Sequence, residues 1–236
     1  MNSFNIFKIS LFTIMVSVSI VTNAQQTKTV SVSNFQEISV SGGIDLYLSQ
    51  AGGESVKIIA HADLIDKVLI EKSGNQLRVR YKENTSWSRI MEGQNTKVYV
   101  NYKTLLAISA SGGSDVVSQN TIKTERLSAH ASGGSDMKLN VSAKDIQVET
   151  SGGSDVYLKG SAVNMTANAS GGSDIDALGF TVEYAKVNAS GGSDINVNVS
   201  KGLEANASGG SDINYKGNAA VKKTSSSKSG DVKRLN

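Results

Sequence analysis

The sequence predicts an all-β protein that folds as a right-handed parallel β-helix, a solenoid whose coils are about 19 residues long. A Ser-Gly-Gly-Ser-Asp pentad recurs at nearly even spacing, and apolar and polar residues alternate with period two on both sides of it. The chain of 236 residues also holds 23 Gly but no Pro. Period-two alternation is typical of strands, and paired glycines are typical of turns. Because so short a unit cannot bury its apolar side alone, successive units are expected to stack.

The pentad occurs in six intact copies, and the step from one pentad aspartate to the next is 18 to 21 residues. These aspartates are Asp115, Asp136, Asp155, Asp174, Asp194 and Asp212. Degenerate copies occur at Ser41–Asp45 and Ser229–Asp231. The blades of a β-propeller need about 40 residues each, so the spacing favours a solenoid. We therefore expect one domain over residues 25–236, with regular SGGSD-turn coils over residues 111–231.

Alignment of the copies on the pentad aspartate predicts which side chains face the interior. The residues seven and five positions before the aspartate are apolar or small, and the residue between those two is always polar. The residue directly after the aspartate is apolar. The inward position nearest the turn holds Ala110, Ala131, Thr150, Ala169, Ala189 and Ala207. This pattern predicts a strand, a glycine turn and a second strand, with a column of small side chains where the two walls come close.

Over residues 25–110 the repeat is looser, and we expect wider first coils together with a cap that covers the edge of the sheet. The expected elements are strands at Val30–Val40, Ile44–Leu48 and Val56–Ala60, a helical turn at His61–Asp66, strands at Val68–Ile70 and Leu77–Tyr81, a long loop at Lys82–Gln94 that carries Trp87, and a strand at Lys97–Tyr102. A turn at Ser73–Asn75 is expected to join the two strands that flank it.

The first 24 residues have the features of an export signal peptide. Lys8 precedes the apolar run Ile9–Val21, and Thr22–Ala24 offers a small-residue cleavage site. The apolar run is shorter than the roughly 20 residues that a membrane-spanning helix needs. We therefore expect an exported mature chain that starts at Gln25, has no transmembrane segment, and resides in the periplasm, at the cell surface or outside the cell.

Four blocks of the sequence occur in a characteristic order: Phe35–Leu48, then Leu77 and Val79, then Val98–Val100, then the series of pentads. In these blocks the chain resembles the bacterial head GIN domain proteins, which are common in Bacteroidetes and are called auto-transporter adhesins. The resemblance extends over nearly the whole mature chain. It implies a β-helical exported domain with an adhesin role in the cell envelope, and it brings no catalytic motif with it.

Composition excludes several classes of function. The chain has no Cys and two His, so thiolate metal sites and cysteine nucleophiles are excluded and few transition-metal ligands remain. The formal net charge of +3 gives no reason to expect nucleic acid as a partner. We expect no cofactor and no catalytic residues.

The recurrent aspartates Asp115, Asp136, Asp155, Asp174, Asp194 and Asp212 leave two interpretations open. Calcium-binding β-rolls also place Asp in glycine-rich turns, but their repeats are about nine residues long and supply more ligands. Here each coil offers one Asp. We therefore favour the interpretation that these side chains accept backbone N–H bonds and fix the turns, with no metal bound, over a calcium column.

These observations predict a non-enzymatic, exported module that binds a surface glycan or a protein, with adhesion as its role. One alternative is a scaffold stabilised by calcium. Another is a glycan-active enzyme, which would need clustered carboxylates on inserted loops. The regular coils leave no room for such loops, so the only carboxylates of this kind are Glu83 and Glu92 in the long loop.

Overall fold

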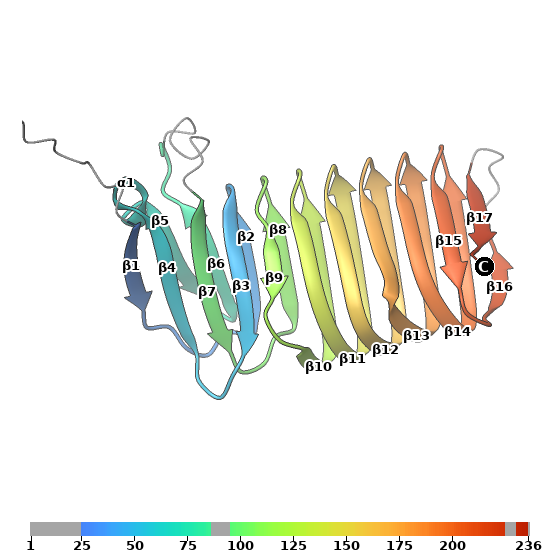
Figure 1. Cartoon of the computed structure of the whole chain (residues 1–236), viewed down its shortest axis with the longest axis horizontal. Coiled ribbons are helices and arrows are strands. Elements are labelled where there is room, and N and C mark those ends of the chain that lie inside the picture. The colour runs from blue at the N-terminus through green and yellow to red at the C-terminus, as the bar shows by residue number, and fades with distance from the viewer. Residues whose placement is uncertain (1–24, 86–94, 225–229, 236) are drawn as a thin grey trace, which may run out of the picture.

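The structure is a computed structural model that describes residues 25–85, 95–224 and 230–235. The expected signal peptide, and most of the expected Lys82–Gln94 loop with Trp87 and Glu92, lie outside the described residues. The described chain is a β-solenoid, which confirms the predicted fold class. Figure 1 shows its strands side by side along the long axis of the molecule, from the N-terminal region at one end to the C-terminus at the other.

In chain order the elements are β1 (Gln25–Val30), β2 (Glu37–Ser41), β3 (Ile44–Gln50), β4 (Ser55–His61), α1 (Ala62–Ile65), β5 (Val68–Ser73), β6 (Gln76–Tyr81), β7 (Thr96–Tyr102), β8 (Ala107–Ser111), β9 (Val116–Ser118), β10 (Ile122–Ser132), β11 (Asp136–Gly152), β12 (Asp155–Gly171), β13 (Asp174–Gly191), β14 (Asp194–Ser208), β15 (Asp212–Lys216), β16 (Ala220–Lys223) and β17 (Asp231–Arg234). From β11 to β14 one long strand forms nearly a whole coil. In the described part of the chain no helix has the length and apolar character needed to cross a membrane.

Hydrogen-bonded ladders give the solenoid two broad faces. The segments that follow the glycine turns form the Asp face, in the order β1, β4, β7, β3, β9, β11, β12, β13, β14, β15, β17. The segments that precede the turns form the Asn face, in the order β5, β6, β2, β8, β10, β11, β12, β13, β14, β16. The long strands β11 to β14 contribute to both faces because they bend from one to the other.

The coils stack in register, so equivalent residues form columns along the axis. Asp155 pairs with Asp174 and Asp174 with Asp194, and the neighbouring glycines and serines pair in the same way. The inward positions deduced from the sequence are buried: Ala169 and Ala189 are each 2 % exposed, and Ala207 is fully buried. The predicted column of small side chains is therefore confirmed.

The first glycine of each pentad has a positive φ, and in the later turns it also packs closely against the turn before it. Gly191 has φ of 79°, and a Cβ there would lie 2.9 Å from the carbonyl oxygen of Gly171. Real Cβ atoms do not approach backbone so closely, and non-glycine residues rarely adopt this φ. The second glycine of the same turn, Gly192, has an ordinary φ and more space, because a Cβ added there would lie 3.7 Å from its nearest neighbour. In this turn, therefore, only the first of the two positions requires glycine.

The N-terminal region departs from the expected parallel coils. β4 pairs antiparallel with β1 and β7, and β5 pairs antiparallel with β6. The helical turn expected at His61–Asp66 and the hairpin around Gly74 are both present. The single strand expected over Val30–Val40 is wrong, because the chain breaks between β1 and β2. Asn34 adopts a φ of 60° there, and its N–H donates to Oε2 of Glu54 at 2.9 Å.

Candidate functional site

The turns are held by the second serine of each pentad, a role that the sequence analysis did not foresee. These serines are fully buried: Ser114, Ser135, Ser154, Ser173, Ser193 and Ser211. Oγ of Ser193 accepts from the N–H of Ser190 at 3.1 Å and lies within hydrogen-bonding distance of the carbonyl oxygens of Ser190 and Ala169, at 2.9 and 3.0 Å. One hydroxyl therefore closes its own turn and reaches the coil before it. In the sequence, the recurrence of Ser between Gly and Asp in every intact pentad is the pattern that could have predicted this role.

The pentad aspartates lie side by side on the Asp face, one per coil. The column continues past the intact pentads to Asp45 at one end and Asp231 at the other. Oδ1 of Asp174 accepts the backbone N–H of Asp194 at 3.0 Å, and Oδ1 of Asp194 accepts that of Asp212 at 3.1 Å. These carboxylates accept backbone N–H bonds as expected, but the donor belongs to the next coil and not to the same turn.

Burial, together with neighbouring carboxylates, raises the pKa of two aspartates of this column. Burial raises the pKa of Asp155 above its ordinary value and the Asp136 carboxylate raises it further, whereas a bond from the backbone of Asp174 opposes the shift. Burial likewise raises the pKa of Asp45, which lies beside Asp115 and Lys97. Within the described ranges, no group of three or more His, Asp or Glu side chains is arranged to hold a metal ion. The column is thus a one-sided series of carboxylates.

A second row of side chains runs parallel to the aspartates, two residues further along each strand. It points to the same side of the sheet because side chains alternate with period two. From the N-terminal end, this outward row consists of Lys57, Tyr99, Tyr47, Val117, Lys138, Tyr157, Asp176, Asn196, Asn214 and Lys233. The row combines aromatic, cationic and amide groups on one flat surface.

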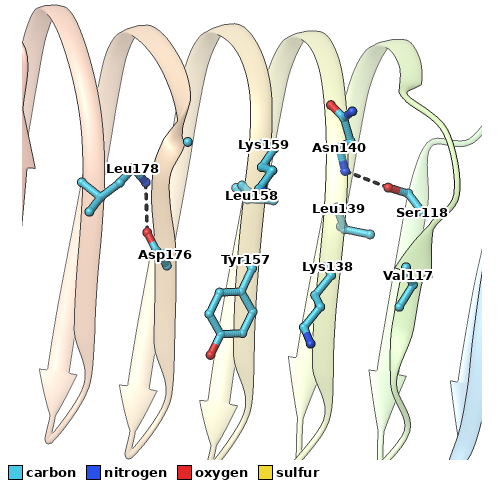
Figure 2. A pocket seen from close by; sticks show the side chains of 11 residues that line it. Val117, Ser118, Lys138, Leu139, Asn140, Tyr157, Leu158, Lys159, Asp176 and Leu178 are labelled. Atoms are coloured by element: carbon cyan, nitrogen blue, oxygen red, sulfur yellow. Dashed lines mark hydrogen bonds between the residues drawn. The ribbon is translucent and has the colours of Figure 1, made fainter.

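The outward row borders a hollow of about 430 Å³ on the Asp face, which we call the Tyr157 hollow. Its lining comes from β9, β11, β12 and β13 and includes Val117, Lys138, Asn140, Tyr157, Lys159 and Leu178. Figure 2 shows the Tyr157 ring face-on, with Lys138 on the neighbouring strand to one side and Asp176 on the strand to the other side. Nζ of Lys138 lies 5.9 Å from the centre of that ring.

An irregularity in strand pairing shapes this hollow. The register between β12 and β13 shifts after Tyr157, because Lys159 pairs with Gly179 where regular pairing would place Leu178. The backbone N–H of Leu178 donates to Oδ1 of Asp176 at 3.1 Å, which stabilises the bulge. Bulges of this kind redirect side chains and occur often beside binding sites. Here the bulge brings the partly exposed Leu178 to one side of the hollow.

The Asn face carries a different surface. Tyr184 is 50 % exposed and borders a hollow of about 420 Å³. Nζ of Lys201 lies 5.8 Å from the centre of its ring. Side chains around it are paired with one another: Lys201 with Glu183 at 2.7 Å and Lys186 with Glu204 at 3.6 Å. The sequence analysis named neither Tyr157 nor Tyr184, although each is a tyrosine at an outward position of a coil in a chain that is 6 % aromatic.

Comparison with known proteins gives a family and a fold. A family model described as "Putative auto-transporter adhesin, head GIN domain" matches residues 34–219. Crystal structures of a "putative adhesin" from Bacteroides fragilis and another from Parabacteroides distasonis are similar, with 20 % and 24 % identity and TM-scores of 0.82 and 0.74. A "putative lipid binding protein" from Parabacteroides distasonis has 17 % identity and a TM-score of 0.71.

Each of these three structural matches covers 91 % of this chain and 98 % of the other. No curated protein matches the chain. At such identities the crystal structures share the fold, and the names of those proteins describe those proteins alone. The family model spans most of the chain, from β2 to β15, and includes every intact pentad. The chain therefore belongs to the head GIN domain family.

Proposed function

We propose that the protein is an exported, non-enzymatic adhesin that binds a surface glycan or a protein through its Asp face. The observation that carries the proposal is the outward row with the Tyr157 hollow, where an exposed ring, two lysines and apolar lining share one side of the sheet. Pockets that bind ligands combine apolar lining with a few polar groups in this way. The adhesin name of the family supports the same role.

A flat solenoid face suits an adhesin for a physical reason. Its backbone is fixed by ladders on both sides of nearly every strand, so little conformational freedom remains to be lost on binding. The coils repeat at about 4.8 Å, which places successive outward side chains at regular intervals along the axis. A ligand that lies along this axis contacts several coils at once, and weak contacts then add together.

The pairing of charged groups favours the Asp face over the Asn face. Lys138 and Lys159 make no ion pair with any described residue. On the Asn face, in contrast, Lys186 is paired with Glu204, and the imidazole of His130 lies 3.6 Å from the carboxylate of Glu149. Unpaired charged groups are available to a ligand, whereas paired groups would first have to separate.

An array of glycans and matrix proteins, probed with the chain over residues 25–236, tests this proposal. We expect at least one probe to bind, the double variant Lys138→Ala and Tyr157→Ala to lose that binding, and the matched double variant Lys186→Ala and Tyr184→Ala on the Asn face to retain it. Equal loss in both variants would contradict the choice of face. Absence of binding to every probe would contradict the adhesin role.

The non-enzymatic part of the proposal has its own test. Incubation with a panel of polysaccharides should release neither reducing ends nor unsaturated products. Turnover that disappears in Glu83→Gln or Glu92→Gln, the two carboxylates of the long loop, would identify a glycan-active enzyme instead.

A further inference from the structure

We infer that the Tyr157 hollow is a subsite for a neutral glycan whose sugar ring stacks against the Tyr157 ring. This inference rests on the proposed function and narrows it to one site and one class of ligand. It is built on the size of the hollow, the accessibility of the ring, the polar groups around it and the balance of charge.

Size and lining suit a small part of a larger ligand. A volume of about 430 Å³ lies near the lower end of the range for small-molecule sites. Leu139 and Leu158 in the lining are each only 2 % exposed, because they belong to the core of the solenoid, and Leu178 forms one side of the hollow. The interior of the solenoid behind them is filled with buried side chains. A long acyl chain would therefore find no channel, whereas a sugar ring can rest on the open surface.

The Tyr157 ring is accessible to such a ligand. The residue is 42 % exposed, and its hydroxyl lies 3.5 Å from Oδ2 of Asp155, at the limit of hydrogen bonding. In the same outward row Tyr47 and Tyr99 stack on each other at 4.8 Å, and Lys57 covers the second ring. Tyr157 has no aromatic partner among the described residues. Nζ of Lys138 lies over the Tyr157 ring, 5.9 Å from its centre. The part of the ring that stays exposed can contact the C–H groups of a sugar.

Donors and acceptors surround the ring, as recognition of sugar hydroxyls requires. Lys138 and Lys159 donate, and the Asn140 side chain can do both. Asp176 accepts through its carboxylate, one oxygen of which already holds the N–H of Leu178. Further along the outward row, Nδ2 of Asn214 donates to Oδ1 of Asn196 at 3.0 Å, which aligns a series of amides in the direction of the axis. A chain of sugars that follows the axis would meet these amides next.

The balance of charge favours a neutral ligand. The two lysines of the hollow attract anions, but the aspartate column runs along the same face, about 7 Å from Lys138 and about 13 Å from Lys159 along their strands. At the shorter distance the carboxylates repel an extended polyanion. A polycation attracted by the column would in turn meet Lys138 and Lys159. Only a neutral polymer can lie along the outward row without unfavourable charge contacts.

Affinity electrophoresis tests this inference with named probes: neutral β-glucan, xylan and mannan, anionic polygalacturonate and cationic polylysine. Flotation with phosphatidylcholine and phosphatidylglycerol vesicles supplies the lipid arm. We expect retardation by a neutral polysaccharide, a loss of affinity of about ten-fold or more in Tyr157→Ala, and retention in Tyr157→Phe, which keeps the ring. Tyr184→Ala, an equally exposed tyrosine on the Asn face, is the matched control and should bind like the wild type.

The other possible outcomes test the subsite, the ligand class and the proposed function separately. Because Tyr157 is at the surface, the thermal melts of the variants should match the wild type, so a loss of binding reports the site. Neutral-glycan binding that survives Tyr157→Ala overturns the subsite, and binding confined to polygalacturonate, polylysine or vesicles overturns the ligand class. A matrix protein bound through Lys138, without any glycan, overturns this inference but leaves the proposed function intact. Binding to none of these probes overturns this inference, and the proposed function is overturned as well only if the array of glycans and matrix proteins also shows no binding.

Discussion

The regular coils from β10 to β15 and the N-terminal region from β1 to β7 share one hydrogen-bonded sheet but differ in strand pairing. All pairings among the coils are parallel and nearly all are in register, whereas the N-terminal region mixes parallel and antiparallel pairs. Their interiors differ as well. The coils hold a column of alanines beside the turns and one fully buried ring, Phe180, while the N-terminal region buries Phe35 and Tyr102 and has no such column. Repetition specifies the first architecture, and individual long-range contacts specify the second.

The sizes of the buried side chains differ between the two regions, so different substitutions are expected to destabilise each one. Beside the turns of the coils the inward side chains are small because opposite walls come close, so enlargement is the damaging change there. The interior of the N-terminal region includes large buried rings, so truncation of a ring is the damaging change there. Burial raises the pKa of the Tyr102 phenol, in keeping with its apolar surroundings.

The largest effect is expected for Phe35→Ala. Phe35 is 1 % exposed, and its removal leaves a cavity in the N-terminal core that costs about 3–5 kcal/mol of unfolding free energy. Urea denaturation measures the loss. Tyr157→Ala removes a ring of similar size from the surface and should leave the midpoint nearly unchanged. A small effect at Phe35 would mean that the N-terminal region unfolds separately from the coils.

Gly191→Ala tests the turns of the coils. The new Cβ meets the Gly171 carbonyl oxygen and the positive φ is unfavourable, so we expect a loss of about 2–4 kcal/mol. Gly74→Ala in the hairpin of the N-terminal region also has a positive φ, of 57°, but nothing lies within 4 Å of its Cβ. It should cost about 1 kcal/mol. Similar losses at the two sites would show that φ matters and close stacking does not.

Ala189→Leu tests the column of small side chains. Ala189 is only 2 % exposed, so its pocket has no room for the larger side chain. The substitution should lower the free energy of unfolding by about 1–3 kcal/mol, and the denaturation midpoint should fall accordingly. Ala169→Leu should behave alike. Asn196→Thr, on the outward row, should have little effect. If both alanine changes left the midpoint unmoved, the coil interior would be loosely packed, and the contrast with the N-terminal region would be lost.

Ser193→Ala should have a smaller effect, about 1–2 kcal/mol, because the N–H of Ser190 and the carbonyl of Ala169 each lose a buried partner. Ser190→Ala is the matched control in the same turn. Its Oγ reaches the Ala169 carbonyl only at 3.5 Å, so thermal melting should show little change. The reverse order of the two effects would assign the turn to the first serine of the pentad.

Much of the coil architecture could be predicted because each coil repeats the same local information. The inward alanines followed from alternation, and the stacking of Asp155 on Asp174 followed from spacing. The antiparallel pairing of β4 could not, since it depends on contacts that occur once. The Tyr157 hollow was also missed. The step from Asp174 to Asp194 is one residue longer than the preceding step, but spacing alone does not tell where the extra residue bulges.

The aspartate column lies mostly on the coils and extends into the N-terminal region only at Asp45, and its effect on stability should be the smallest. The folded-state pKa of Asp155 is raised, so the folded protein takes up a proton more readily than the unfolded chain does. Above the folded-state pKa, the charged carboxylate of Asp155 lowers the stability of the folded protein. This loss of stability disappears as the pH falls toward 3.8, the ordinary pKa of an aspartate, because the folded protein is protonated first. From these carboxyls alone, the melting temperature should therefore rise slightly as the pH falls through that range.

Sodium chloride should stabilise the folded protein in the same direction, because neighbouring carboxylates about 5 Å apart repel one another and salt screens that repulsion. Calcium at equal ionic strength should raise the melting temperature little beyond the effect of sodium chloride, because Oδ1 of Asp174 already accepts the N–H of Asp194. Asp174→Asn keeps an acceptor for this bond and removes one charge, so the variant should melt at the wild-type temperature or slightly above it. A calcium-specific rise of many degrees that is lost in Asp174→Asn would show instead that the coils are held together by a metal column, and that they differ from the N-terminal region in ligand as well as in strand pairing.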